Sequence, residues 1–268
     1  MQGSIGVLDS GIGGLTVVKE IVKALPHEDI TYLGDTARVP YGTRGKEVIT
    51  KFALEMVDFL LSKKVKFLVV ACNTISAVCL DKIIEVSPVP VLGVIDPTVD
   101  YALRKSKGNT IGVIGTRATI GSKVYETEIK NKNPESNVIT ASCPLFVPIA
   151  EEGLGDHPAT ELLAREYLAE FKNAALDILI LGCTHYPLLL NTIQKEVGSD
   201  VIVVDSAHPT AETLKSILKE KELLNNEPVK GSLEIYVTDA PDRVQLLVEQ
   251  FLGNPLPGGL KKVILTNL

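Results

Sequence analysis

Two short apolar runs in this chain of 268 residues each end in a cysteine that polar residues follow. Residues 67–71 lead into Cys72, and residues 178–182 lead into Cys183. Each run has the length and the β-branched content of a buried strand. Ligand sites of open α/β folds lie beyond the carboxyl ends of such strands. We therefore expect both thiols to face one pocket.

Two thiols at one pocket allow two kinds of chemistry. They can form a disulfide or hold a metal, or they can act as two opposed acid–base groups. The chain has four cysteines and no Cys-x-x-Cys pair, whereas redox and zinc sites usually use such closely spaced ligands. Two thiols on opposite sides of one carbon can remove a proton from one face and return one to the other, which is racemisation or epimerisation. We interpret Cys79 and Cys143 as structural, because free cysteine packs as a small hydrophobe.

A thiol acts as a base in its thiolate form, which helix amino termini and polar donors favour. Residues 73–74 and 184–185 are predicted to begin the helices after the two strands, which would place each thiol at a positive helix end. His185 is a candidate acid or base beside Cys183. Glu151 follows a strand-like run over residues 144–149 and could orient His185.

Two polar loops could complete the pocket. Residues 9–14 form a glycine-rich turn from strand to helix, where the backbone can approach an anion and the Asp9 carboxylate would face the pocket. Residues 34–42 end in a Pro-Tyr-Gly turn that could offer backbone donors to a carboxylate. The turn at residues 9–14 does not have the glycine spacing of a dinucleotide or phosphate loop.

The chain repeats one layout. A strand enters a glycine-containing turn at residues 5–11 and again at 111–116, a strand ending in cysteine follows, and then a strand ending in Asp96 or Asp205. Helical periodicity separates the strands, as in residues 46–62 and 160–175. This alternation predicts an α/β fold of two pseudo-symmetric lobes, each a mostly parallel sheet flanked by helices, with the active site in the cleft between them.

The residues after Asp205 have no counterpart in the first half of the chain. They are predicted to form two helices and two strands, at residues 212–222, 233–238, 242–252 and 262–265. We expect this tail to return to the first lobe. The lobes would then comprise residues 1–97 plus 208–268, with Asp9 and Cys72, and residues 98–207, with Glu151, Cys183 and His185.

Composition excludes several classes of function. The net charge is −6 and no long run of Lys or Arg occurs, which disfavours nucleic acid or an anionic membrane as the partner. No apolar stretch reaches the roughly 18 residues of a membrane-spanning helix. The amino terminus lacks the basic segment of a signal peptide. We expect a cytoplasmic protein without a metal site.

The motifs together resemble those of the cofactor-independent aspartate/glutamate racemase family. The resemblance covers essentially the whole chain, and the two cysteine motifs are its most specific part. Ile75 and residues 96–98 depart from the family pattern. The matching segments are residues 9–16, 34–42, 71–74, 115–119 with Ser122 and Tyr125, 143–148, 151–153, 182–187, 204–207 and 236–239.

The resemblance implies interconversion of L- and D-glutamate without a cofactor, in a homodimer, with D-glutamate entering peptidoglycan synthesis. Cys72 would remove the proton of D-glutamate with help from Asp9. Cys183 would remove that of L-glutamate with help from His185 and Glu151. Aspartate or hydantoin racemisation, or binding of a small acid without chemistry, are the alternatives. The substrate would be held by Asp9, Ser10, Pro40, Tyr41, Gly42, Asn73, Thr74, Thr116, Thr119, Thr184 and His185.

Overall fold

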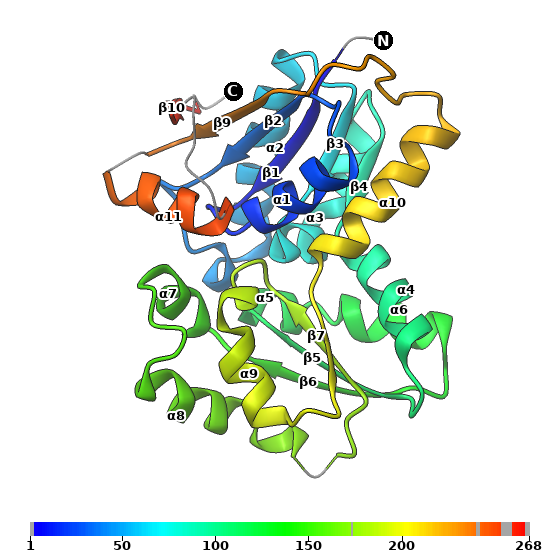
Figure 1. The fold of residues 1–268 in the computed structure, drawn as a ribbon, viewed down its shortest axis with the longest axis vertical. Helices are drawn as coiled ribbons and strands as arrows, with labels where there is room; N and C mark the ends of the chain where they lie inside the picture. Colours follow the sequence, from blue (N-terminus) through cyan, green and yellow to red (C-terminus); the bar gives the residue numbers. More distant parts are fainter. Residues whose placement is uncertain (1–2, 173, 240–241, 253–258, 266–268) are drawn as a thin grey trace.

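Two parallel sheets, each flanked by helices, form the two lobes of the molecule in the computed structural model (Figure 1). The structure describes residues 3–172, 174–239, 242–252 and 259–265. Every strand pairing in the described residues is parallel. The predicted α/β class with two parallel sheets is confirmed. We call the lobe around the six-stranded sheet the first lobe and the lobe around the four-stranded sheet the second.

Four strands of the first sheet have the same order as the four strands of the second. The first runs β10-β9-β2-β1-β3-β4 and the second runs β6-β5-β7-β8, so β1 to β4 of the first lobe correspond to β5 to β8 of the second. This correspondence is the structural form of the repeat in the sequence. The strands are β1 (Ile5–Asp9), β2 (Ile30–Gly34), β3 (Phe67–Val70), β4 (Val91–Gly93), β5 (Thr110–Gly115), β6 (Asn137–Ser142), β7 (Ile178–Gly182), β8 (Ile202–Val204), β9 (Leu233–Val237) and β10 (Lys261–Lys262).

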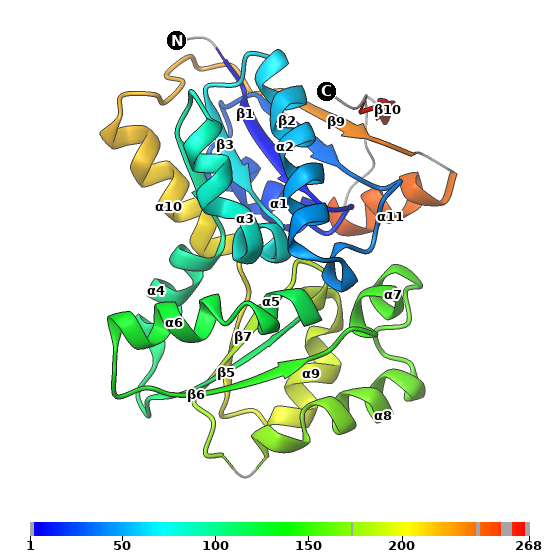
Figure 2. The same cartoon turned by 180° about the vertical axis from the view of Figure 1, so that it is seen from behind.

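Helices cover both faces of the first sheet. In Figure 1, α1 (Leu15–Ala24), α10 (Ala207–Glu220) and α11 (Asp242–Leu252) lie in front of it. In Figure 2, α2 (Lys46–Ser62) and α3 (Asn73–Val86) lie on the other side. Successive residues of β1 alternate between the two cores, since Val7 packs with α1 and α10 while Leu8 packs with α2 and α3. A sheet buried on both faces explains the continuous apolar strands.

The second sheet is covered in the same way. On one face, Val113 packs with α4 (Ile95–Lys105) and α6 (Val124–Lys132). On the other, Ile114 packs with α7 (Phe146–Glu151), α8 (Pro158–Tyr167) and α9 (Leu190–Val197). The remaining short helices are α5 (Arg117–Gly121), η1 (Tyr41–Thr43), η2 (Ala169–Phe171) and η3 (Tyr186–Leu189).

The local predictions differ from the structure at several places. The helix predicted over residues 46–62 is α2, but the one over 160–175 ends at Tyr167 and gives way to η2. The strand predicted at residues 144–149 is wrong, because these residues lead into helix α7. Pro148 fits there since the first turn of a helix needs no N–H donors. Asp96, expected at a strand end, lies in the first turn of α4.

The chain after β8 returns to the first lobe. Strand β9 pairs with β2, and β10 pairs with β9. The last predicted strand, 262–265, is paired only at its first residue, and residues 266–268 lie outside the described part. The lobe boundaries at 97/98 and 207/208 stay a prediction, and they fall at the first turns of α4 and α10. No described helix is both long and apolar enough to span a membrane.

Candidate active site

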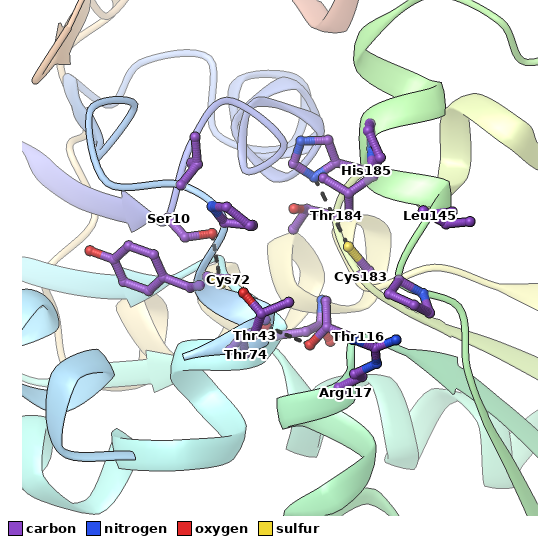
Figure 3. Close-up of a pocket in the computed structure, with 18 of the residues that line it drawn as sticks. Ser10, Thr43, Cys72, Thr74, Thr116, Arg117, Leu145, Cys183, Thr184 and His185 are labelled. Atoms are coloured by element: carbon purple, nitrogen blue, oxygen red, sulfur yellow. Dashed lines mark hydrogen bonds between the residues drawn. The ribbon is translucent and has the colours of Figure 1, made fainter. Parts of the chain in front are cut away.

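A cavity of about 440 Å³ lies between the lobes, lined by residues that follow the carboxyl ends of strands in both sheets. Ser10 follows β1 and Thr116 follows β5, which are equivalent strands. Cys72 and Cys183 follow the equivalent strands β3 and β7. Figure 3 shows Cys72 beside Ser10 on the first lobe and Cys183 beside His185 on the second. The two cysteines that the sequence repeat relates thus line one cavity from the two lobes.

Twelve of the fourteen residues predicted for the site line this cavity. Asp9 and Thr119 are the exceptions, and both are buried behind the lining. The structure brings the predicted set together, and the roles of its members stay predictions. The twelve are Ser10, Pro40, Tyr41, Gly42, Cys72, Asn73, Thr74, Thr116, Glu151, Cys183, Thr184 and His185.

The Cys72 thiol is held protonated. It donates to Ser10 Oγ at 3.3 Å, and only 5% of the residue is exposed. Burial, and then the charge of Asp9, raise the pKa of the Cys72 thiol to about 12, although the hydrogen bond to Ser10 acts in the opposite direction. At neutral pH this group is therefore a proton donor. Helix α3 begins directly after Cys72, as the sequence predicts.

Cys183 has a different environment. Its Sγ lies 4.0 Å from Nδ1 of His185, and His185 Nε2 lies 3.1 Å from Glu151 Oε1. Burial lowers the pKa of His185, but the hydrogen bonds to Cys183 and Glu151 and their charges outweigh it and raise that pKa to about 10. An imidazolium beside Cys183 stabilises a thiolate. The two thiols thus have different charged neighbours, the Asp9 carboxylate near Cys72 and the His185 imidazole beside Cys183.

The predicted helix end beside Cys183 is wrong. The residues after it form the 3-10 turn η3 around Pro187, and α9 begins only at Leu190. Cys183 therefore has the His185 imidazolium as its positive neighbour in place of a helix amino terminus.

His185 is enclosed by parts of the first lobe. The Phe251 ring of α11 meets the imidazole edge-on, with centroids 5.4 Å apart. A Cβ on Gly13 would collide with His185 Nδ1 and with Thr184 Oγ1. The turn between β1 and α1 thus needs glycine because the lobes touch there.

Asp9 is fully buried behind Cys72. Its Oδ2 accepts from the Gly11 N–H at 2.9 Å, and its Oδ1 has no hydrogen-bond partner among the described residues. Burial raises the pKa of Asp9, while His185 and the Gly11 N–H act in the opposite direction. The carboxylate influences Cys72 through its charge and does not line the cavity.

Thr119 supports the lining from behind. The Oγ1 atoms of Thr74 and Thr116 lie 2.9 Å apart, and Thr119 Oγ1 lies 3.3 and 3.0 Å from them. Because α3 and α5 belong to different lobes, this triangle of hydroxyls joins the lobes at the floor of the cavity.

The Pro-Tyr-Gly turn is anchored by polar contacts that the sequence did not reveal. The carboxylate of Asp35 accepts from the Tyr41 hydroxyl, from Arg38 and from Thr238. The anchored turn places Gly42 against the second lobe, where a Cβ would lie 2.5 Å from that of Thr116. This glycine is required by a close approach of the lobes.

One wall of the cavity was missed by sequence reasoning. It is largely apolar, because the segment before and within α7 turns its side chains toward the opening, with Arg117 as its charged member. Assigning residues 144–149 to a strand hid this wall, whereas their helical course places several on the cavity side. The additional lining residues are Val39, Thr43, Arg117, Pro144, Leu145, Val147, Pro148 and Tyr167.

This architecture has known counterparts. The family model of Asp/Glu/Hydantoin racemases matches residues 5–214, and the chain belongs to this family of racemases. It is 47% identical over 253 residues to the glutamate racemase of Geobacter metallireducens, with 94% of each chain covered. It is also 47% identical over 249 residues to that of Aquifex aeolicus, covering 93% of this chain and 94% of the relative.

Solved structures agree with this assignment. Glutamate racemase from Francisella tularensis, in complex with D-glutamate, superposes with a TM-score of 0.93 at 42% identity and covers 99% of each chain. A glutamate racemase isoform from Bacillus anthracis gives the same TM-score at 39% identity, covering 98% of this chain and 97% of the other. Aspartate racemase from Picrophilus torridus shares only the fold, with a TM-score of 0.59 at 20% identity.

Proposed function

We propose that this protein interconverts L-glutamate and D-glutamate by proton transfer between its two cavity thiols and the α-carbon. The observation that carries the proposal is that Cys72 and Cys183 follow equivalent strands of the two lobes and line one cavity. Glutamate is favoured over aspartate or hydantoin because relatives at 41–47% identity are glutamate racemases, whereas the aspartate racemase neighbours are 18–20% identical.

The proposed reaction removes one proton from the α-carbon and adds another to its opposite face. The Cys183 thiolate takes the α-proton of L-glutamate and becomes a thiol. The Cys72 thiol gives its proton to the opposite face of the carbanion and becomes a thiolate, which leaves D-glutamate. The reverse reaction uses the same steps in the opposite order. His185 with Glu151 stabilises the Cys183 thiolate, and Asp9 would receive or return a proton at Cys72.

The difficult step is formation of the carbanion, because the α-proton of an amino acid is a very weak acid. We propose that hydroxyl, amide and backbone donors of the cavity stabilise it without a cofactor. Closure of the lobes would exclude water. The donors proposed to hold the amino and carboxylate groups are those of Ser10, the 40–42 turn, Asn73, Thr74, Thr116, Thr184 and His185, with Asp9 and Thr119 behind them.

The biological setting is part of the proposal. D-Glutamate would supply peptidoglycan synthesis and so cell shape, in the cytoplasm, and the enzyme would act as a homodimer. The family resemblance supports these points, and light scattering of the purified protein tests the dimer. We also propose the lobe limits 1–97 plus 208–268 and 98–207, supported by the pairing of β9 with β2.

The test is a substrate panel with purified protein and no added cofactor. Circular dichroism follows optical activity, and proton NMR in D₂O follows the α-proton of each amino acid. We expect both signals to decay with either enantiomer of glutamate. If the signals decay only with aspartate or only with a hydantoin, that compound is the substrate in place of glutamate. Binding of glutamate without α-proton exchange would indicate a binding protein.

A further inference from the structure

Tyr125 contacts a cavity residue from outside the cavity. It lies in α6 of the second lobe, is 2% exposed, and does not line the cavity. Its hydroxyl donates to Oδ1 of Asn73 at 2.6 Å. Asn73 is the first residue of α3 in the first lobe and lines the cavity. A buried hydrogen bond therefore joins the second lobe to a proposed substrate contact in the first.

Ser206 holds the other end of the same carboxamide. It lies just before α10, where the chain returns to the first lobe. Asn73 Nδ2 donates to Ser206 Oγ at 3.2 Å, and Ser206 Oγ is also 3.3 Å from Asn73 Oδ1. The second hydrogen on Nδ2 has no acceptor within the described part of the chain. It is therefore free to donate to a ligand.

Two hydrogen bonds orient the amide. Its oxygen accepts from the Tyr125 hydroxyl, and its Nδ2 donates to Ser206 Oγ. Burial raises the pKa of the Tyr125 phenol, so the hydroxyl keeps its proton and remains a donor.

We propose that Tyr125 and Ser206 are positioning residues that hold the Asn73 carboxamide with its free N–H toward a carboxylate of the substrate. This inference rests on the proposed function, since it assigns Asn73 a carboxylate to bind. A flipped carboxamide would point its oxygen at that carboxylate and repel it. The Tyr125 bond also crosses between the lobes, so the donor is oriented only when the lobes are arranged as in this structure.

Tyr125→Phe tests the inference, because it removes the hydroxyl and keeps the ring. We expect the KM for both enantiomers of glutamate to rise about tenfold, with a smaller change in kcat, since one hydrogen bond to a charged group typically has this effect. Ser206→Ala should change KM in the same direction.

A double-mutant cycle with Asn73→Ala separates positioning from general damage. If Tyr125 acts through Asn73, then Tyr125→Phe adds no further rise in KM once the carboxamide is gone. Tyr186→Phe is the matched control, because Tyr186 is buried and its hydroxyl donates to the Cys143 carbonyl at 2.8 Å. It should lower the melting temperature like Tyr125→Phe and leave KM near that of the wild type.

The dissociation constant of glutamate, measured by calorimetry, keeps this inference separate from the proposed function. A wild-type protein that binds glutamate without racemising it overturns the proposed function alone. An unchanged Kd and KM in Tyr125→Phe overturns the inference, and so does a tenfold effect that persists in the Asn73→Ala background.

Discussion

Nε2 of His185 lies 3.1 Å from Oε1 of Glu151, on the side of the imidazole away from Cys183. His185 lies just before η3 and Glu151 is the last residue of α7, and their contact agrees with the expectation from the sequence that Glu151 could orient His185. Their contact raises the pKa of His185 and so favours the protonated imidazole beside Cys183, whereas Cys72 has the Asp9 carboxylate as its charged neighbour. The two thiols are equivalent in the fold and unequal in their electrostatic surroundings.

Glu151→Gln should weaken the Cys183 side of the reaction. His185 is protonated below its pKa of about 10, so the pair is present at neutral pH and is lost as the pH rises through that value. Removing the Glu151 charge lowers this pKa. We expect the alkaline limb of kcat/KM for L-glutamate to move toward neutral pH, and the rate at about pH 9 to fall roughly tenfold. A pH profile that superposes on the wild type would contradict the role of Glu151.

Alkylation should distinguish the two thiols. Because the pKa of Cys72 is raised to about 12, only about one part in ten thousand of it is thiolate at about pH 8. Iodoacetamide should therefore label Cys183 before Cys72, as followed by mass spectrometry of peptides. Cys79 and Cys143, whose pKa values burial raises to about 11 and about 12, serve as slow internal references. Faster labelling of Cys72 than of Cys183 would reverse the proposed asymmetry.

Serine at either cavity position should divide the reaction into halves. Cys72→Ser should lose at least about a hundredfold in racemisation, while Cys183 still exchanges the α-proton of L-glutamate with solvent. Cys183→Ser should retain exchange with D-glutamate only. Cys79→Ser is the control, since Cys79 packs in the α2–α3 core. Exchange of both enantiomers at the wild-type rate in either active-site variant would show that the two-base assignment is wrong.

Gly42→Ala should hold the lobes apart. The added Cβ would lie 2.5 Å from Cβ of Thr116, closer than real contacts allow, whereas a Cβ on Gly45 would meet nothing within 4 Å. We expect kcat/KM to fall by about tenfold or more in Gly42→Ala, since misplacement of reacting groups by about 1 Å costs up to about a hundredfold. Gly45→Ala should match the wild type. Equal activity of the two variants would mean that the approach of Gly42 to Thr116 is not needed for the reaction.

The sequence predicted those features that depend on local pattern. Apolar runs ending in Cys72 and Cys183 located two central strands, and the repeated landmarks indicated two similar sheets. Strand ends define the cavity edge in any parallel sheet. This is why most of the predicted residues meet there.

Features that depend on tertiary contact or on weak local signals were not predicted. The short apolar run before Glu151 fits a strand or a helix equally well, and packing against the second sheet decides for α7. Asp9 was expected to face the cavity, yet Ser10 lines it while Asp9 lies behind. The contact between Asn73 and Tyr125 joins residues 52 positions apart in different lobes. No periodicity in the chain encodes such a pairing.

The most direct test of the two-base account is the isotope content of substrate and product at early times in D₂O. The wild-type protein converts only a few per cent of the L-glutamate before the reaction is stopped. Mass spectrometry after chiral separation then measures deuterium in each enantiomer. The account predicts D-glutamate with solvent deuterium at the α-carbon, because Cys72 supplies a proton exchanged with solvent, while the remaining L-glutamate keeps its original proton. D-Glutamate that retains the substrate's own α-proton would show that one group transfers it across both faces, and would contradict the account.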